Sequence, residues 1–286
     1  MLASALVFSG WMAIIIETIL ILAGLYKVDN PWYCKLQNLI CAASVRRMTI
    51  ATRTLAYGDL DTALTGVLHW NTAQPGPRPG ILLIHGGAGL DEHARDQARR
   101  YTELGYTVLA CDMYGDGVAG DRDRVIACVT ALRDDPALLA RRGRAGLTAL
   151  SGCAEAGGPM AAVGFCFGGM AALTLARSGA DLAGAVSIHG SLATSSPAKP
   201  GGVTAKILAC HGSADPHVPM DDVVSFAAEM DGSGADWQMI IYGGAMHGFT
   251  HRQAAPGSIP GVAYDPVADA RSFSATEAFL AGVLGG

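Results

Sequence analysis

The motif "GFCFGG", residues 164–169, is the most informative part of the sequence. It follows the apolar run "MAAVGF" (160–165) and precedes "FGGMAALTLARSG" (167–179), which predicts a buried strand, a sharp turn at Cys166 and a helix. The glycines on either side of Cys166 supply the small residues that such a crowded turn requires. The spacing is that of a nucleophile elbow, G-x-S-x-G, with cysteine in place of serine. By itself the motif also fits a buried structural cysteine.

Two later motifs favour a reactive cysteine. "CHGSADPHVP" (210–219) ends a predicted strand and carries Asp215, and "YGGAMHGFTH" (242–251) ends the next one and carries His247. Cysteine, aspartate and histidine therefore occur in the chain order of the α/β-hydrolase triad. Open α/β sheets build their sites beyond the carboxyl ends of the strands, so we expect the three side chains to meet there.

The rest of the body alternates short apolar runs with helical stretches. Continuous Val, Ile and Leu runs indicate strands that are buried on both faces, and the alternation predicts a mostly parallel sheet flanked by helices. The predicted strands span 64–70, 80–87, 106–112, 160–165, 183–190, 205–212 and 237–244, and the main helices span 91–105, 121–135, 220–234 and 265–284.

"HGGAG" (85–89) follows the predicted strand 80–87, where the loop that supplies an oxyanion N–H is expected. We therefore predict the amides of Gly87 and Phe167 as the two oxyanion donors. Three further side chains at strand ends are candidates for contact with the substrate, namely His85, Tyr114 and His251.

The composition narrows the possible functions. The chain has 286 residues, half of them apolar, and a net charge of -5, which argues against a nucleic-acid surface. Its seven cysteines include no C-x-x-C pair and no metal-ligand spacing, so neither a disulfide framework nor a metal site is implied.

The first 47 residues differ from the rest. Residues 3–26 form an apolar run long enough to span a membrane as a helix, interrupted only by Glu17, which is costly at the centre of a span. The basic residues that flank this run all follow it, so a spanning helix would leave the domain 48–286 in the cytoplasm. Two alternatives remain open: the true start is Met48, or the run is an amphipathic or signal segment.

The quoted motifs, together with "ILLIHGGAGLDEHARDQARRYTELGYTVLACDMYGDG" (81–117), closely resemble the dienelactone hydrolase family from about residue 55 to the C-terminus. The resemblance implies an α/β-hydrolase fold, a Cys166–Asp215–His247 triad and no metal or organic cofactor. The sequence departs from the family at two positions. Gly86 stands where a glutamate is expected, and His251 stands where an arginine binds the substrate carboxylate.

The resulting expectation is a hydrolase of activated carboxylic esters or lactones, acting on a small molecule through an acyl-thioester intermediate. A thioesterase or acyl transferase would use the same residues. A non-enzymatic binding or redox-sensing protein could use Cys166 alone, but it would not need Asp215 and His247.

Overall fold

The computed structural model describes residues 49–74, 76–115, 117–255 and 257–285. The predicted apolar helix 3–26 lies outside these ranges. Within them, no helix combines the length and the apolar composition that a bilayer crossing demands.

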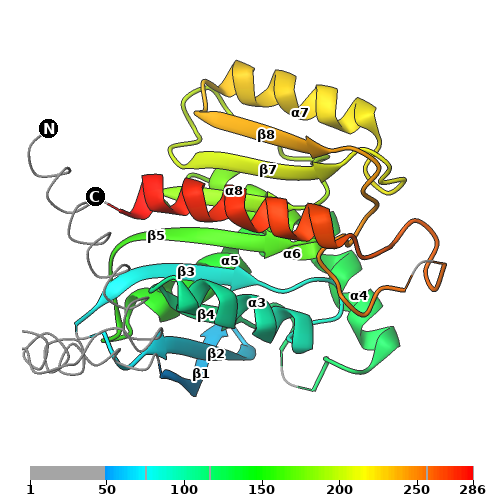
Figure 1. The fold of residues 1–286 in the computed structure, drawn as a ribbon. Helices are drawn as coiled ribbons and strands as arrows, with labels where there is room; N and C mark the ends of the chain where they lie inside the picture. Colours follow the sequence, from blue (N-terminus) through cyan, green and yellow to red (C-terminus); the bar gives the residue numbers. More distant parts are fainter. Residues whose placement is uncertain (1–48, 75, 116, 256, 286) are drawn as a thin grey trace, which may run out of the picture. The chain divides into compact units, whose positions relative to one another are not determined.

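An eight-stranded sheet forms the centre of the described chain, in the order β1-β2-β4-β3-β5-β6-β7-β8 (Figure 1). The pairs β1–β2 and β2–β4 are antiparallel, and every other pair is parallel, as the alternation of runs predicts. The strands are β1 (Ile50–Asp59), β2 (Thr62–Asn71), β3 (Arg78–Ile84), β4 (Thr107–Cys111), β5 (Ala156–Phe165), β6 (Gly184–Ile188), β7 (Lys206–Gly212) and β8 (Trp237–Tyr242).

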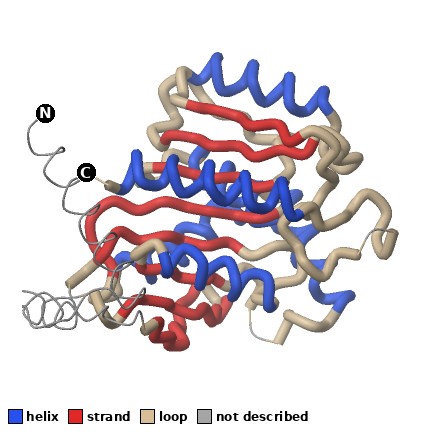
Figure 2. Tube along the Cα trace, in the orientation of Figure 1, coloured by secondary structure: helices blue, strands red, loops and turns tan. Residues whose placement is uncertain are grey.

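Helices cover both faces of the sheet (Figure 2). Buried apolar side chains form two cores. The cores alternate along the strands: Leu82 and Ile84 of β3 face one, while Ile81 and Leu83 face the other. The first core includes α4 (Arg122–Asp134), α5 (Pro136–Ser151), α6 (Phe167–Arg177) and α7 (Met220–Ser233), and the second includes α3 (Glu92–Glu103) and α8 (Pro266–Leu284).

Most elements begin and end within a few residues of the predicted bounds, but β1 was not predicted. It pairs with β2 along its whole length through a hairpin turn at Leu60 and Asp61. Leu60 has a positive φ of 51°, in a turn that contains no glycine or asparagine. The usual hairpin signal in sequence is therefore missing.

Candidate active site

The sharp turn predicted at Cys166 is present between β5 and α6. Cys166 has φ 54° and ψ -115°, a combination that L-residues rarely adopt. Its amide donates to the carbonyl of Ile188 on β6 (3.0 Å), and its own carbonyl accepts from the amides of Gly169 (3.0 Å) and Met170 (3.2 Å). These bonds hold the strained residue at the N-terminus of α6, whose dipole favours a thiolate there.

The two glycines of the motif are needed because backbone lies against them. A Cβ on Gly164 would overlap the carbonyl of Gly168, and a Cβ on Gly168 would overlap the carbonyl of Ile84 at the end of β3. Both overlaps involve main chain, which cannot rotate away. The helix can therefore approach the sheet this closely only with glycine at both positions.

Asp215 lies in the turn after β7 and is almost fully buried. Its Oδ1 accepts from the amides of His217 (2.8 Å) and Val218 (3.2 Å), which leaves Oδ2 to face His247. The backbone of the turn therefore fixes the carboxylate in one orientation.

His247 follows β8 and is held by a short pairing with the loop that precedes α8. Its amide donates to the carbonyl of Gly261, and its carbonyl accepts from the amide of Ala263, both at 3.1 Å. The ring lies between the other two predicted residues, with Nδ1 2.7 Å from Oδ2 of Asp215 and Nε2 3.0 Å from Sγ of Cys166. Three loops that are far apart in sequence thus bring together cysteine, histidine and aspartate.

The electrostatics favour a thiolate–imidazolium pair. Burial raises the pKa of the Cys166 thiol, but His247 and the backbone amides of Phe167 and Gly87 outweigh burial, and the net pKa is lowered. Burial lowers the pKa of His247, but its bonds to Asp215 and Cys166 raise the pKa to about 10. Burial likewise raises the pKa of Asp215, and His247 reverses that effect. These shifts favour a Cys166 thiolate paired with a protonated His247.

The backbone amides of Phe167 and Gly87 lower the pKa of the Cys166 thiol. The Tyr114 hydroxyl donates to the carbonyl of Gly87 (3.0 Å), which belongs to the peptide that follows the Gly87 N–H, and so fixes the loop that carries this amide. The predicted oxyanion donors are therefore two of the groups that act on the thiol, and their binding of an oxyanion stays a prediction.

Two of the predicted substrate contacts are buried side chains. His85 is completely buried, donates from Nδ1 to the carbonyl of Gly86 (2.7 Å) and accepts at Nε2 from the amide of Met113 (3.2 Å), so both of its ring nitrogens are bonded to backbone. Tyr114 is only 5% exposed and its hydroxyl already holds Gly87. Both side chains are polar and lie at the ends of predicted strands, so the sequence suggested contact with the substrate. These features do not distinguish such a contact from support of the neighbouring backbone.

His251 remains a candidate contact. Its ring is half-buried and stacks on the ring of His93, with centroids 3.8 Å apart. Its Nε2 lies beside Gly86. A Cβ on that glycine would be 3.6 Å from Nε2 of His251 and 3.9 Å from the Cβ of Cys166. The glycine thus leaves room for an imidazole near the nucleophile.

Sequence reasoning missed a group of buried polar side chains behind His247. His189, which ends β6, lies with its ring centroid 5.4 Å from that of His247, and Thr250 bonds both His189 and His93. A buried histidine that ends a strand gives no sequence signal that separates this role from simple packing. Throughout the ranges that the structure describes, no group of three His, Cys, Asp or Glu side chains is arranged to hold a metal ion.

Comparisons with known proteins point to one family. The model of the dienelactone hydrolase family matches residues 65–284. A dienelactone hydrolase-like promiscuous phosphotriesterase, P91, from metagenomic libraries is 36% identical, with a TM-score of 0.77 over 82% of this chain and 98% of its own. A structure named m3DLH is 37% identical, with a TM-score of 0.77 over 82% of this chain and 99% of its own.

An uncharacterized protein of Caenorhabditis elegans, K02A2.1, is 37% identical over 123 residues, which is 42% of this chain and 78% of that protein. At lower identity, a putative dienelactone hydrolase from Klebsiella pneumoniae shares the fold, with 21% identity and a TM-score of 0.68 over 82% of this chain and 99% of its own. The fold, the site and the family match lead to one conclusion: the chain belongs to the dienelactone hydrolase family, whose members are hydrolases that act on ester bonds.

Proposed function

We propose that the protein hydrolyses activated carboxylic esters or lactones through a thioester on Cys166, with His247 as the acid–base group and Asp215 as its orienting partner. The observation that carries this proposal is the geometry at His247, which lies within hydrogen-bond distance of both other residues. A buried aspartate that fixes the histidine tautomer serves proton transfer, which a merely structural cysteine does not need.

The reaction follows from the resting ion pair. The Cys166 thiolate attacks the ester carbonyl, a C–S bond forms, and the carbonyl oxygen becomes an oxyanion that the Gly87 and Phe167 amides stabilise. Collapse of this intermediate breaks the C–O bond, and the His247 imidazolium gives its proton to the departing alkoxide. The neutral imidazole then takes a proton from water, the hydroxide attacks the thioester, and the thiolate leaves with its charge restored.

A thiolate is itself a good leaving group, so the first tetrahedral intermediate can simply expel Cys166 again. It forms the thioester only when the substrate's own leaving group is comparably good. This comparison favours enol esters, aryl esters and strained lactones over amides and simple alkyl esters. A thioesterase or acyl transferase would form the same acyl-enzyme and differ only in the group that supplies or accepts the acyl unit.

A second candidate activity, phosphotriester hydrolysis, is suggested by the relative P91, which is described as a promiscuous phosphotriesterase. In that reaction the thiolate would displace an aryl oxide from phosphorus, and water would then release the phosphate diester. The same two amides would face the phosphoryl oxygen. Turnover of paraoxon by the purified protein, absent in Cys166→Ala, would support this candidate.

The test of the main proposal compares p-nitrophenyl acetate turnover in wild type, Cys166→Ala and Cys128→Ala. Cys128 is the matched control because it is also a partly exposed free thiol. We expect Cys166→Ala to lose turnover while Cys128→Ala keeps it, and iodoacetamide to label Cys166 first. Wild-type turnover in Cys166→Ala would overturn the proposal, and rapid labelling without any turnover would instead favour a thiol-based sensor.

We also propose that residues 3–26 tether the catalytic domain 48–286 to a membrane, with that domain on the cytoplasmic side. The support is the length of the apolar run and the position of the basic residues after it. Fractionation of cells that express the full chain tests this proposal, and recovery of all the protein in the soluble fraction would contradict it.

A further inference from the structure

His189 is strained, buried and adjacent to His247. It has a positive φ of 40°, one of three such non-glycine residues in the described chain, together with Leu60 and Cys166. Its amide donates to the carbonyl of Cys210 (2.8 Å), and its side chain is fully buried. Strain of this kind persists where surrounding structure enforces it, often at functional sites.

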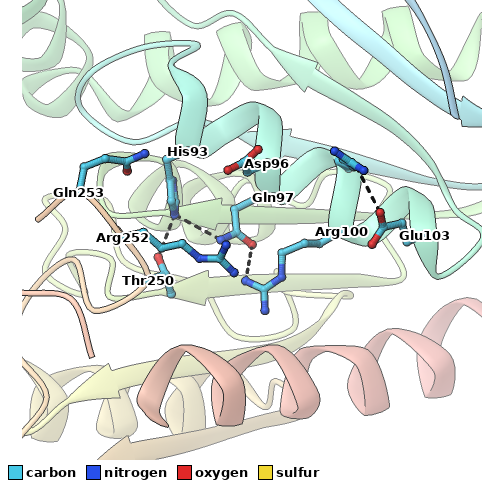
Figure 3. A pocket seen from close by; sticks show the side chains of 9 residues that line it. His93, Asp96, Gln97, Arg100, Glu103, Thr250, Arg252 and Gln253 are labelled. Atoms are coloured by element: carbon cyan, nitrogen blue, oxygen red, sulfur yellow. Dashed lines mark hydrogen bonds and ion pairs between the residues drawn. The ribbon is translucent and has the colours of Figure 1, made fainter. Parts of the chain in front are cut away.

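A chain of polar contacts runs from the surface of α3 to His189. Arg100 bonds Oε1 of Gln97 (3.2 Å), Nε2 of Gln97 lies 3.4 Å from Nε2 of His93, and His93 bonds the hydroxyl of Thr250 (3.0 Å). Figure 3 shows these side chains around a pocket between α3 and the loop after His247. The hydroxyl of Thr250 also bonds Nε2 of His189 (2.9 Å).

Arg100 fixes the orientation of the Gln97 amide, because a guanidinium can only donate. The Gln97 oxygen accepts from Arg100, so its amide N–H₂ faces His93. Within the described chain, Nδ1 of His93 and Nδ1 of His189 are both buried with no hydrogen-bond partner, so each neutral ring carries its proton on Nε2. The Thr250 hydroxyl oxygen, which has two lone pairs, accepts from both Nε2–H groups.

His189 is consequently held as a neutral ring with its proton on Nε2. Among the described residues, its buried Nδ1 has no hydrogen-bond partner, so a second proton there would be unsolvated. Burial, followed by the charge of His247, lowers the pKa of His189 well below its usual value. Burial and the neighbouring His251 also lower the pKa of His93, to about 3.

We propose that His189 and Thr250 are positioning residues for the catalytic ion pair: they hold His247 between Asp215 and Cys166 and keep a neutral ring against it. This inference rests on the proposed function. The titratable groups around His189 are His93, His247 and His251, and those around His247 are Cys166, His189, His211, Asp215, His217 and His251.

The role of Thr250 follows from its two hydrogen bonds, one to His189 and one to His93. It lies three residues after His247 on the same loop, and its hydroxyl ties that loop to β6 through His189 and to α3 through His93. Loss of the hydroxyl would leave two buried ring nitrogens without their shared partner. The His247 loop and the His189 ring would then be free to shift relative to Cys166.

The experiment measures thiolate absorbance at 240 nm against pH, with Cys166→Ala as the baseline, in wild type, Thr250→Val, Thr250→Ser and Thr102→Val. Thr102 is the matched control, because its buried hydroxyl donates to the carbonyl of Ala98 within its own helix α3 (2.8 Å). We expect the thiolate of Thr250→Val to form about one pH unit higher than in wild type, a tenfold weaker ion pair. The readout needs no substrate, so it stands even if ester turnover is not found.

Kinetics should agree with the titration. We expect Thr250→Val to lose roughly tenfold in kcat at neutral pH with little change in KM, and Thr250→Ser, which keeps the hydroxyl, to recover most of the loss. A Thr250→Val protein that is folded and titrates like wild type would overturn the proposal. So would an equal shift in Thr102→Val, which would show a general effect of a lost hydroxyl.

A second variant covers the case in which Thr250→Val does not fold. His189→Gln removes the imidazole beside His247 without adding a charge, and its side-chain N–H₂ can still donate to the Thr250 oxygen. We expect its thiolate to form at higher pH than in wild type, and an unchanged titration in a folded His189→Gln protein would contradict the proposal.

Discussion

Replacement of Asp215 by asparagine tests the proposed role of the carboxylate with almost no change in shape. The amide oxygen can keep the two bonds from the His217 and Val218 amides, because Oδ1 accepts both. The new N–H₂ group then takes the place of Oδ2 and donates to Nδ1 of His247. The ring must carry its proton on Nε2, facing Cys166, where it cannot accept the thiol proton.

The size of the effect follows from the pKa of His247. Four interactions raise that pKa from 6.5 to about 10, and two of them involve Asp215. If Asp215 supplies about half of this increase, its loss weakens the thiolate–imidazolium pair by about fiftyfold. The unfavourable tautomer adds to this loss, so kcat/KM should fall by at least about a hundredfold.

The assay is hydrolysis of p-nitrophenyl acetate at neutral pH, with the thiolate absorbance at 240 nm recorded on the same samples. Asp222→Asn is the control, because it removes one nearby negative charge that has no bond to His247. We expect Asp222→Asn to stay near wild type in both measurements. Activity of Asp215→Asn within threefold of wild type, with a normal thiolate, would refute the argument.

The remaining predictions concern pH, the elbow and the N-terminal segment. With increasing pH, kcat/KM should rise as Cys166 loses its proton, at a pH below the usual pKa of a thiol. It should fall only as the pH passes about 10, where His247 loses its proton, and a decline that starts near pH 7 would contradict this expectation. Gly168→Ala should lower the free energy of unfolding in urea by about 3 kcal/mol, because its Cβ meets main chain, whereas Gly232→Ala meets nothing within 4 Å and should be neutral or stabilising. A chain that begins at Met48 should fold and hydrolyse esters at the full-length rate, and an insoluble product would show that the preceding segment is needed.

The parallel part of the fold could be predicted because its strands are short apolar runs, each followed by a helix. The run at 160–165 and the glycines around Cys166 also specify the turn, since few other residues fit between strand and helix. By contrast, β1 has mostly half-exposed or exposed side chains and turns at Leu60 without a glycine. Pairing of an edge strand depends on its neighbour, so its own sequence carries a weak signal.

In the site, too, local motifs predict some residues, whereas others depend on tertiary contacts. Cys166, Asp215 and His247 could be selected because each ends a predicted strand in a recognisable motif. His85 was a candidate substrate contact for the same reason, yet the structure buries it and bonds both of its ring nitrogens to backbone. The bonds that join Thr250 to His189 and His93 connect positions up to 157 residues apart, and only the folded chain brings them together.

The most direct test is identification of the acyl-enzyme. The protein would be mixed with p-nitrophenyl acetate, quenched in acid within the first turnover and digested for peptide mass spectrometry. We predict one acetyl group, bound as a thioester to Cys166 and absent after longer incubation, when water has released it. Turnover that proceeds with no acetyl group on Cys166 at any time, or with the group on another residue, would contradict the assignment of Cys166 as the nucleophile.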